Sequence, residues 1–267
     1  MNKIGLIAGN RKFPLLFAQA ARKKNYSVVA VAIKGEASIK LKSLVDKVYW
    51  LDLKEYNRMF SIFKAEGITK VIMAGQISPW RLFSRDVQSN SQIRELLAGI
   101  SDMKAATIFS KIIIRLEQEG LKLLDSTTFI EESLPKEGVL TKKEPNSSEW
   151  EVIHFGFELA KAIAHLDIGQ TVAVKNKAIV AVEGLEGTDN LIRRSGKIAR
   201  GGFMVVKVSR PKQDMRFDIP VVGLNTVKTL IKARATCLGI EAGKTLFIDK
   251  EESLRLADKK GLVIVAL

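Results

Sequence analysis

The chain has 267 residues, enough for two domains of ordinary size, and its 46% hydrophobic content can supply a core to each. This composition argues against a disordered protein. The longest apolar stretches, such as Val28 to Ile33 and Leu262 to Leu267, fall far below the roughly 20 residues that a transmembrane helix needs. Arg11 and Lys12 interrupt the apolar N-terminus too early for a secretory signal. We therefore expect a cytoplasmic protein without a transmembrane helix.

The charge balance points to an anionic partner. There are 43 Lys and Arg residues against 29 Asp and Glu residues, a formal charge of +14 spread along the chain. Nucleic acid, an anionic membrane surface and a phosphorylated small molecule all satisfy this balance. The single cysteine, Cys237, cannot form an internal disulfide, which fits a reducing compartment. With only 2 histidines, imidazole-rich zinc or iron sites are not expected, and Mg²⁺ or Mn²⁺ on oxygen ligands is the natural metal.

From Lys3 to Ile130, short apolar runs alternate with amphipathic segments, which predicts a β-α-β-α order and a parallel sheet. Pro14 suits the first turn of a helix, and Gly67 suits the end of another. The expected strands are Lys3–Ala8, Val28–Ile33, a run near Val48 and Val71–Ala74, and the expected helices are Pro14–Lys24, Lys54–Glu66, Gln92–Ala98 and Met103–Glu119.

The stretch from Ser133 to Ser148 is the richest in proline, serine and charge, so we place a domain boundary there. We expect an N-terminal domain over residues 1–132, a linker over 133–149 and a C-terminal α/β domain over 150–267. Thr171–Val174 and Ala178–Val182 are expected to pair as a hairpin across Asn176-Lys177. The other expected elements are helices at Trp150–Ala164, Asp189–Arg194, Thr226–Thr236 and Glu251–Lys259, and strands at Phe203–Val208, Thr245–Ile248 and Leu262–Val265.

Two loops of the N-terminal half follow expected strands. Gly9 to Pro14 runs into a helix N-terminus, where free N–H groups and the helix dipole can hold a phosphate. This loop lacks the G-x-G-x-x-G spacing of dinucleotide-binding proteins, and the second strand ends in Lys34 rather than in a ribose-binding acid. Gly75 to Ser78 follows the fourth strand, at the edge where open α/β sheets bind ligands. Tight turns without a ligand explain both loops equally well.

The segment from Glu183 to Asp189 places three carboxylates and two glycines between a strand and a helix start. Thr188 or Asp189 can serve as a helix cap, which accounts for one polar residue. Two further carboxylates, Glu183 and Glu186, beside flexible glycines suit coordination of a cation or approach of a phosphate. We favour this functional interpretation over capping alone.

The segment from Lys207 to Pro220 interleaves cations and carboxylates with apolar residues. If Met215 to Ile219 is extended, Arg216 and Asp218 share one face. A carboxylate between apolar neighbours and beside an arginine is a candidate base or metal ligand. A structural Arg–Asp pair is the alternative, and residue types alone favour it. Gly223 to Thr226 then begins another helix, whose N-terminus can bind an anion or simply be capped.

Together these segments resemble the LpxI-type UDP-2,3-diacylglucosamine diphosphatases, which act in lipid A synthesis. The resemblance covers essentially the whole chain, and its two long ordered blocks make it specific. The blocks are GLIAG at Gly5 to Gly9, AGQIS at Ala74 to Ser78, LDIGQ at Leu166 to Gln170, AVEGLEGTD at Ala181 to Asp189 and QDMRFDIPVVGLNT at Gln213 to Thr226.

The resemblance implies an α/β fold with a Rossmann-like N-terminal domain, a parallel sheet and a second α/β C-terminal domain. It implies that a UDP-linked diacylated glucosamine is held between the domains, and that water attacks its diphosphate. The products would be UMP and 2,3-diacylglucosamine 1-phosphate. The catalytic aspartate of the family's R-x-D-x-P motif matches Asp218, which we assign as a metal ligand or water-activating group. Relatives often carry glycine where this chain has Arg11, which puts close backbone approach to a ligand there in question.

The assigned roles extend to neighbouring residues of the same blocks. Mg²⁺ or Mn²⁺ is the expected cofactor, and cations near the diphosphate would neutralise its charge. The predicted catalytic residues are Asp218, Asp214, Arg216 and Lys207; the predicted metal ligands are Asp218, Glu183, Glu186 and Asp189; and the predicted substrate-binding residues are Gly9, Asn10, Gly75, Gln76, Gly187, Thr188, Lys212, Gln213, Asn225 and Thr226.

Two other functions are weighed against this hydrolase. A nucleic-acid-binding protein would fit the +14 charge, but the aromatic residues are few and no nucleic-acid motif is present. A sugar-nucleotide oxidoreductase would use the N-terminal sheet, but the glycines and the acidic residue that bind NAD are missing. We therefore expect a lipid-linked nucleotide as partner, with loose association to the anionic inner face of the inner membrane and no nucleic acid. The sequence leaves the oligomeric state open, a homodimer included.

Overall fold

A computed structural model of the protein describes residues 2–78, 81, 89–99, 105–211 and 213–267. The chain forms two compact units. The N-terminal unit contains Met1–Glu131 together with Asp214–Asp218, and the C-terminal unit contains Glu132–Gln213 and Ile219–Leu267. A short piece of the second half of the chain therefore belongs to the first unit.

The N-terminal unit is built on a five-stranded sheet in the order β3-β2-β1-β4-β5. Every pairing in this sheet is parallel, which confirms the predicted parallel sheet. The chain moves outward in one direction from β1 to β3 and then in the other from β4, as in Rossmann-like folds. The strands are β1 (Asn2–Ala8), β2 (Tyr26–Ile33), β3 (Lys47–Leu51), β4 (Lys70–Ala74) and β5 (Lys122–Leu123).

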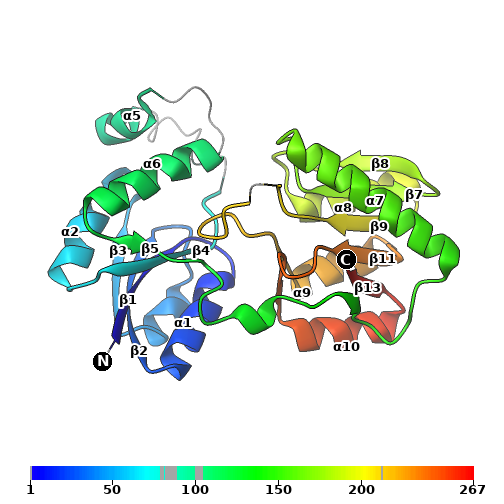
Figure 1. Cartoon of the computed structure of the whole chain (residues 1–267), viewed down its shortest axis with the longest axis horizontal. Helices are drawn as coiled ribbons and strands as arrows, with labels where there is room; N and C mark the ends of the chain where they lie inside the picture. The colour runs from blue at the N-terminus through cyan, green and yellow to red at the C-terminus, as the bar shows by residue number, and fades with distance from the viewer. Residues whose placement is uncertain (1, 79–80, 82–88, 100–104, 212) are drawn as a thin grey trace. The chain divides into compact units, whose positions relative to one another are not determined.

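Helices cover both faces of this sheet (Figure 1). Val29 and Val31 of β2 pack against α2 and α6, whereas α1 packs on the sheet outside that cluster. The expected helix at Lys54–Glu66 is two elements, a short η2 and then α2, and the start of the helix expected at Met103 lies outside the described residues. The helices are α1 (Phe13–Lys23), η1 (Ile39–Ser43), η2 (Leu53–Glu55), α2 (Arg58–Ala65), α5 (Ser91–Leu97), α6 (Ala105–Gln118) and η3 (Glu131–Ser133).

The C-terminal unit contains a six-stranded sheet in the order β6-β13-β11-β9-β7-β8 and a separate parallel pair, β10-β12. β9, β11 and β13 are parallel, whereas β7 runs antiparallel to both β8 and β9. The second α/β domain that was predicted is therefore confirmed, with a mixed sheet. The strands are β6 (Gly138–Val139), β7 (Thr171–Lys175), β8 (Ala178–Val182), β9 (Met204–Lys207), β10 (Val221–Gly223), β11 (Cys237–Ile240), β12 (Leu246–Ile248) and β13 (Val263–Ala266).

Two apolar clusters hold the layers of this unit together. One face of the sheet, including Val172 and Val206, packs against α7. The other face, including Ala173 and Val205, packs against the remaining helices (Figure 1). The alternation of neighbouring residues between the two clusters is the period of two expected of a strand buried on both faces. The helices are α7 (Ser147–His165), α8 (Thr188–Ala199), α9 (Leu224–Lys232) and α10 (Lys250–Lys260).

The stretch 133–149, for which we expected a linker, contains ordered structure. β6 pairs antiparallel with β13 at the edge of the C-terminal sheet. Asn146 caps α7 by accepting a hydrogen bond from the backbone N–H of Glu149, and the Glu149 side chain accepts one from the N–H of Asn146 in return. This reciprocal capping explains why α7 begins at Ser147, before the expected Trp150.

The hairpin prediction is confirmed, and one helix prediction is wrong at its end. β7 and β8 pair antiparallel, and the two turn residues Asn176 and Lys177 have φ values of 50° and 59°. Helix α9 ends at Lys232 rather than at Thr236, because Arg234 takes the left-handed φ of 60°. The chain then enters β11 at Cys237, a strand that the sequence pattern did not indicate.

Cys237 is a buried structural thiol, with 2% of its surface exposed. Burial raises its pKa far above the ordinary range, so the reactive thiolate is scarce at neutral pH. We expect no reaction with Ellman's reagent in the folded protein and one equivalent per chain in urea. A rapid reaction of the native protein would contradict this environment for the thiol.

Candidate functional site

The two predicted loops of the N-terminal unit lie side by side at the carboxyl ends of β1 and β4. The N–H of Gly9 donates to the carbonyl of Ala74 at 2.9 Å, and the N–H of Asn10 donates to the carbonyl of Gln76 at 2.7 Å. These two adjacent strands are where the strand order reverses, which is the usual ligand position in an open α/β sheet. The structure therefore brings Gly9, Asn10, Gly75 and Gln76 together.

Two glycines allow this close approach of the loops. A Cβ atom on Gly9 would lie 2.4 Å from the carbonyl oxygen of Gln76. A Cβ atom on Gly75 would lie 2.4 Å from the carbonyl oxygen of Asn10, and Gly75 also has a φ of +83°. Arg11 has a φ of 66° in the same turn, a conformation that glycine adopts with least strain. This conformation is a physical reason for the glycine that the family resemblance implies at that position.

Sequence reasoning missed a polar cluster beside these loops. The Glu36 carboxylate accepts hydrogen bonds from the Asn10 amide at 2.7 Å and from the Ser78 hydroxyl and N–H at 3.0 and 3.2 Å. Only 3% of the Glu36 side chain is exposed. Arg81 Nε lies 3.8 Å from the same carboxylate. The only signal in the sequence was Glu36 itself, an acidic residue three positions after the end of β2. The sequence-based search for an acid after this strand stopped at Lys34.

The segment from Asp214 to Asp218 forms a turn, so the extended conformation considered for Met215 to Ile219 is wrong. The N–H groups of Phe217 and Asp218 both donate to the carbonyl of Asp214 at 3.3 Å. The Asp214 side chain also accepts a hydrogen bond from the N–H of Arg216. An aspartate that accepts from the backbone two residues ahead favours a turn over a strand.

This turn is attached to the N-terminal unit by backbone and aromatic contacts. Ser126 donates its N–H to the carbonyl of Met215 at 2.9 Å and its hydroxyl to the carbonyl of Arg216 at 2.6 Å. The Phe217 ring stacks on Phe109 with ring centres 5.1 Å apart. Asp218 follows directly, so the predicted catalytic carboxylate belongs to the N-terminal unit although it is encoded in the second half of the chain.

Asp214 and Arg216, both predicted as catalytic, bind each other. Arg216 donates from Nε and from Nη2 to the two carboxylate oxygens of Asp214, the latter at 2.8 Å. The side-chain hydrogen bond from Arg216 lowers the pKa of the Asp214 carboxyl, and the same bond raises the pKa of Arg216. The alternative considered from the sequence was a structural pair between Arg216 and Asp218, whereas the structure pairs Arg216 with Asp214, and this pair bridges residues of the turn.

In the C-terminal unit, Lys207, Thr188 and Glu183 form one chain of hydrogen bonds. Lys207 Nζ donates to the Thr188 hydroxyl at 2.7 Å, and that hydroxyl donates to the Glu183 carboxylate at 2.9 Å. The three residues come from the end of β9, the start of α8 and the residue after β8. β8 and β9 are both antiparallel to β7 and hence end at the same edge.

The beginnings of α8 and α9 are joined by the predicted residues Asp189, Asn225 and Thr226. The Asp189 carboxylate accepts from the Asn225 amide at 2.7 Å and from the Thr226 hydroxyl at 3.1 Å. Gly187 stands before α8 with a φ of +80°. Glu186 instead pairs with Arg194 at 2.6 Å and points to a different set of partners.

The predicted metal ligands do not converge on a common point within the C-terminal unit. Glu183 accepts from Thr188, Glu186 from Arg194 and Asp189 from Asn225, so each carboxylate already has its own protein donor. Among the described residues, no group of three or more His, Cys, Asp or Glu side chains could hold a metal ion. The assignment of Glu183, Glu186 and Asp189 as one ligand set therefore does not fit this arrangement.

Two predicted residues precede the turn at Asp214. The side chain of Gln213 accepts a hydrogen bond from the N–H of Arg210 at 3.0 Å. Gln213 is the last residue before the chain leaves the C-terminal unit. Lys212 lies outside the described residues.

Both halves of the chain match models of one protein family. Residues 3–133 match the LpxI N-terminal domain, and residues 136–265 match the LpxI C-terminal domain. The chain belongs to the LpxI family. A curated relative, the UDP-2,3-diacylglucosamine pyrophosphatase LpxI of Caulobacter vibrioides (strain ATCC 19089 / CIP 103742 / CB 15), is 26% identical over 279 residues, covering 100% of this chain and 98% of its own.

Two solved structures share a distant similarity with this chain. The biotin carboxylase subunit of pyruvate carboxylase is 13% identical with a TM-score of 0.29, over 75% of this chain and 42% of that chain. N5-carboxyaminoimidazole ribonucleotide synthetase from Thermotoga maritima is 17% identical with a TM-score of 0.25, over 70% of this chain and 43% of that chain. This chain spans less than half of either structure.

Proposed function

We propose that the protein hydrolyses the diphosphate of UDP-2,3-diacylglucosamine to UMP and 2,3-diacylglucosamine 1-phosphate, a step of lipid A synthesis. The observation that carries this proposal is the match of both units to one family, together with a full-length relative named for that activity. Two sets of polar residues support it. One lies at the strand ends of the N-terminal unit around Asn10, and the other lies at the starts of α8 and α9 in the C-terminal unit.

Asp218 is the group that we assign to the attacking water. The oxygen of water bonds to one phosphorus, the bridging P–O bond breaks, and the leaving phosphate keeps the electron pair of that bond. Asp218 accepts a proton from the water as it attacks, and this proton then passes to solvent. The turn supports this role because its backbone hydrogen bonds and its contact with Phe109 fix the position of the Asp218 backbone within the N-terminal unit.

Lys207 is the cation that we assign to the diphosphate. It lies at the end of β9 beside the start of α8, where free backbone N–H groups also favour an anion. Its bond to the Thr188 hydroxyl orients the ammonium group without neutralising its charge. Arg216, in contrast, already has its charge compensated by Asp214, so we expect it to contribute chiefly by keeping the turn closed.

A divalent cation is proposed to arrive with the substrate. Mg²⁺ keeps several waters and is often held by one or two carboxylates together with substrate phosphates, rather than by a complete protein cage. That mode needs no group of three carboxylates, which fits the separate partners of Glu183, Glu186 and Asp189. In this proposal the substrate phosphates would hold the cation, which would neutralise their charge, and Asp218 acts on the water.

We propose that the enzyme works in the cytoplasm and associates loosely with the inner face of the inner membrane. A formal charge of +14 favours an anionic leaflet, at about 1 kcal/mol for each basic residue near the surface. In the part of the chain that the structure describes, no helix is both long enough and apolar enough to cross a membrane. Binding to the surface would give access to a substrate that carries two acyl chains.

The test is turnover of UDP-2,3-diacylglucosamine by the purified protein with Mg²⁺ or Mn²⁺. We expect UMP release that stops when EDTA is added and resumes when excess metal is restored. Calorimetry with Mg²⁺ alone should show no tight binding, because the cation is proposed to need the diphosphate. Turnover that persists in EDTA after extensive dialysis would contradict the metal requirement, and absence of UMP with either metal would contradict the function.

A further inference from the structure

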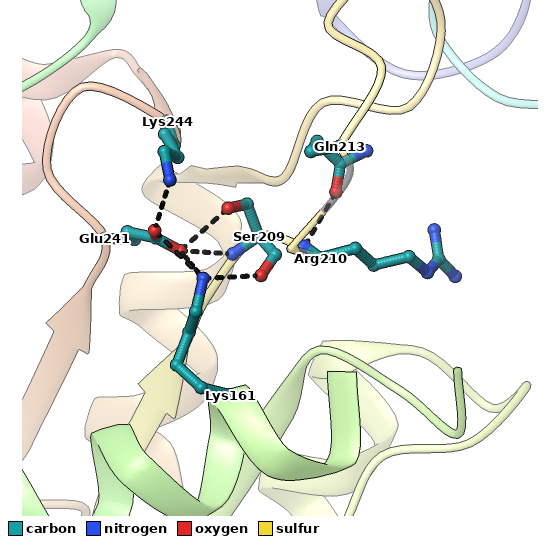
Figure 2. Close-up of polar contacts among 6 residues, drawn as sticks. All are labelled: Lys161, Ser209, Arg210, Gln213, Glu241 and Lys244. Carbon is teal, nitrogen blue, oxygen red and sulfur yellow. Dashed lines mark hydrogen bonds and ion pairs between the residues drawn. The ribbon is translucent and has the colours of Figure 1, made fainter. Parts of the chain in front are cut away.

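Glu241 lies outside every residue set assigned above, yet it has the densest polar contacts of the residues in Figure 2. It follows β11 directly, and only 6% of its surface is exposed. Its carboxylate accepts from the Ser209 N–H at 2.7 Å and from the Ser209 hydroxyl at 2.8 Å. It also accepts from Lys161 at 3.1 Å and from Lys244 at 3.0 Å.

Ser209 is the residue on which these contacts converge. It is fully buried, and Lys161 of α7 donates to its carbonyl at 3.1 Å in addition to binding Glu241 (Figure 2). The next residue is also held, because Arg210 Nε lies 2.7 Å from the Asp167 carboxylate in the turn after α7. The backbone after β9 is therefore fixed to α7 and to the residue after β11 at once.

The fixed backbone is one of two arms that lead to the catalytic turn. The chain leaves the C-terminal unit after Gln213, forms the turn that ends at Asp218, and re-enters the unit at Ile219. On the returning arm, the carbonyl of Pro220 accepts from the N–H of Leu246 at 2.8 Å.

Residues 241–246, which we name the clamp, therefore hold both arms. Glu241 binds the departing arm at Ser209, and Leu246 binds the returning arm at Pro220. The clamp is itself folded as a turn, with the N–H of Thr245 donating to the carbonyl of Glu241 at 3.2 Å. Glu241, Thr245 and Leu246 are buried, whereas Gly243 and Lys244 between them are exposed, so the two residues that bind the arms belong to the core of the unit.

We propose that Glu241 is a positioning residue for the hydrolase reaction: its carboxylate fixes Ser209, and the clamp thereby sets where the turn carrying Asp218 leaves and re-enters the C-terminal unit. This inference rests on the proposed function of Asp218. A small shift of a reacting group is enough to slow a reaction about a hundredfold. Because the clamp holds the chain on both sides of the segment Asp214–Asp218, we expect it to affect kcat.

The negative charge of the Glu241 carboxylate is maintained by its hydrogen bonds. Burial by itself would raise the pKa of its carboxyl, but the hydrogen bonds from the Ser209 backbone, Lys244, the Ser209 hydroxyl and Lys161 outweigh burial and lower it. The carboxylate is therefore ionised at neutral pH and can accept every one of these bonds. An amide of the same shape would keep the volume and lose acceptors, because its NH₂ group only donates.

The test compares Glu241→Gln and Lys161→Met with the control Lys244→Met. Lys161 binds both Glu241 and Ser209, whereas Lys244 is half-exposed and, among the described residues, its side chain binds Glu241 alone, so the control removes the same charge without touching the arm. We expect kcat for UMP release to fall about 10- to 100-fold in the first two variants, with KM within about threefold of wild type. Lys244→Met should stay near wild type.

Hydrogen exchange supplies a readout that loss of stability alone would not give. The amides of Phe217 and Asp218 should exchange faster in Glu241→Gln, while the amides of α10, in the same unit as Glu241, keep their wild-type rates. A uniform increase through the whole unit would make Glu241 a stability residue only and overturn the proposal. So would an unchanged kcat in a folded Glu241→Gln protein. If this variant does not fold, Lys161→Met decides the question by the same two readouts.

Failure of the proposal is distinguishable from failure of the proposed function. Wild-type protein that releases no UMP contradicts the function, and the exchange experiment still tests whether Glu241 controls the turn. Wild-type protein that turns over, together with a fully active Glu241→Gln variant, contradicts only the positioning role.

Discussion

Asp218→Asn is expected to lower kcat for UMP release by about a thousandfold, because general-base catalysis by a positioned carboxylate contributes roughly 10² to 10⁴ in rate. The substitution keeps the size of the side chain but removes its negative charge and its ability to accept a proton. KM should change little if the carboxylate acts on water rather than on the bound nucleotide. Steady-state measurement of UMP release gives both constants.

The matched control for this variant is Asp258→Asn. Asp258 is a partly buried aspartate of α10 that accepts from the N–H of Lys142, so the same chemical change is made at a residue with an ordinary structural contact. This control should retain wild-type kcat, and both variants should show wild-type circular dichroism. Full activity of the Asp218→Asn protein would contradict the mechanism, because it depends on the carboxylate of Asp218.

Gly75→Ala is expected to destabilise the N-terminal unit by about 2–5 kcal/mol, from left-handed backbone strain and a steric clash added together. Gly75 has a φ of +83°, and its new Cβ would lie 2.4 Å from the carbonyl oxygen of Asn10. Backbone atoms cannot move aside as a flexible side chain can, so the loops after β1 and β4 must separate. Urea unfolding followed by fluorescence would measure the loss.

Gly67→Ala separates the two causes of that loss. Gly67 has a similar φ of +69°, but a Cβ there meets nothing within 4 Å. It should lose only the strain, about 1–2 kcal/mol, and keep its activity. Equal losses in the two variants would mean that the contact between Gly75 and Asn10 is not tight.

The layered fold could be predicted from the sequence because its strands and helices have clear local patterns. Asn176-Lys177 indicated a hairpin, and the strand and helix segments from Lys3 onward indicated a parallel sheet, both of which the structure contains. Prediction failed where the structure depends on long-range contacts or on an unusual backbone conformation. The helix α9 stops before Arg234 because a non-glycine residue takes a left-handed conformation, which no residue type in that segment announces.

Some residues of the candidate site could be placed from the sequence, and others could not. Residues that follow a strand, such as Gly9 and Gly75, could be placed by the rule that parallel strands present their carboxyl ends at one edge. The attachment of the turn at Asp214 to the N-terminal unit could not, because it depends on Ser126 and Phe109, which lie about a hundred residues away in the sequence. The same is true of Glu241, whose partners come from three separate segments.

The measurement that tests the central claim most directly is identification of both products from UDP-2,3-diacylglucosamine in heavy-oxygen water, by mass spectrometry and phosphorus NMR. We predict equal amounts of UMP and 2,3-diacylglucosamine 1-phosphate, with one heavy oxygen atom incorporated into one of the two new phosphate groups. Formation of UDP and a free diacylated sugar, or recovery of intact substrate, would contradict the account.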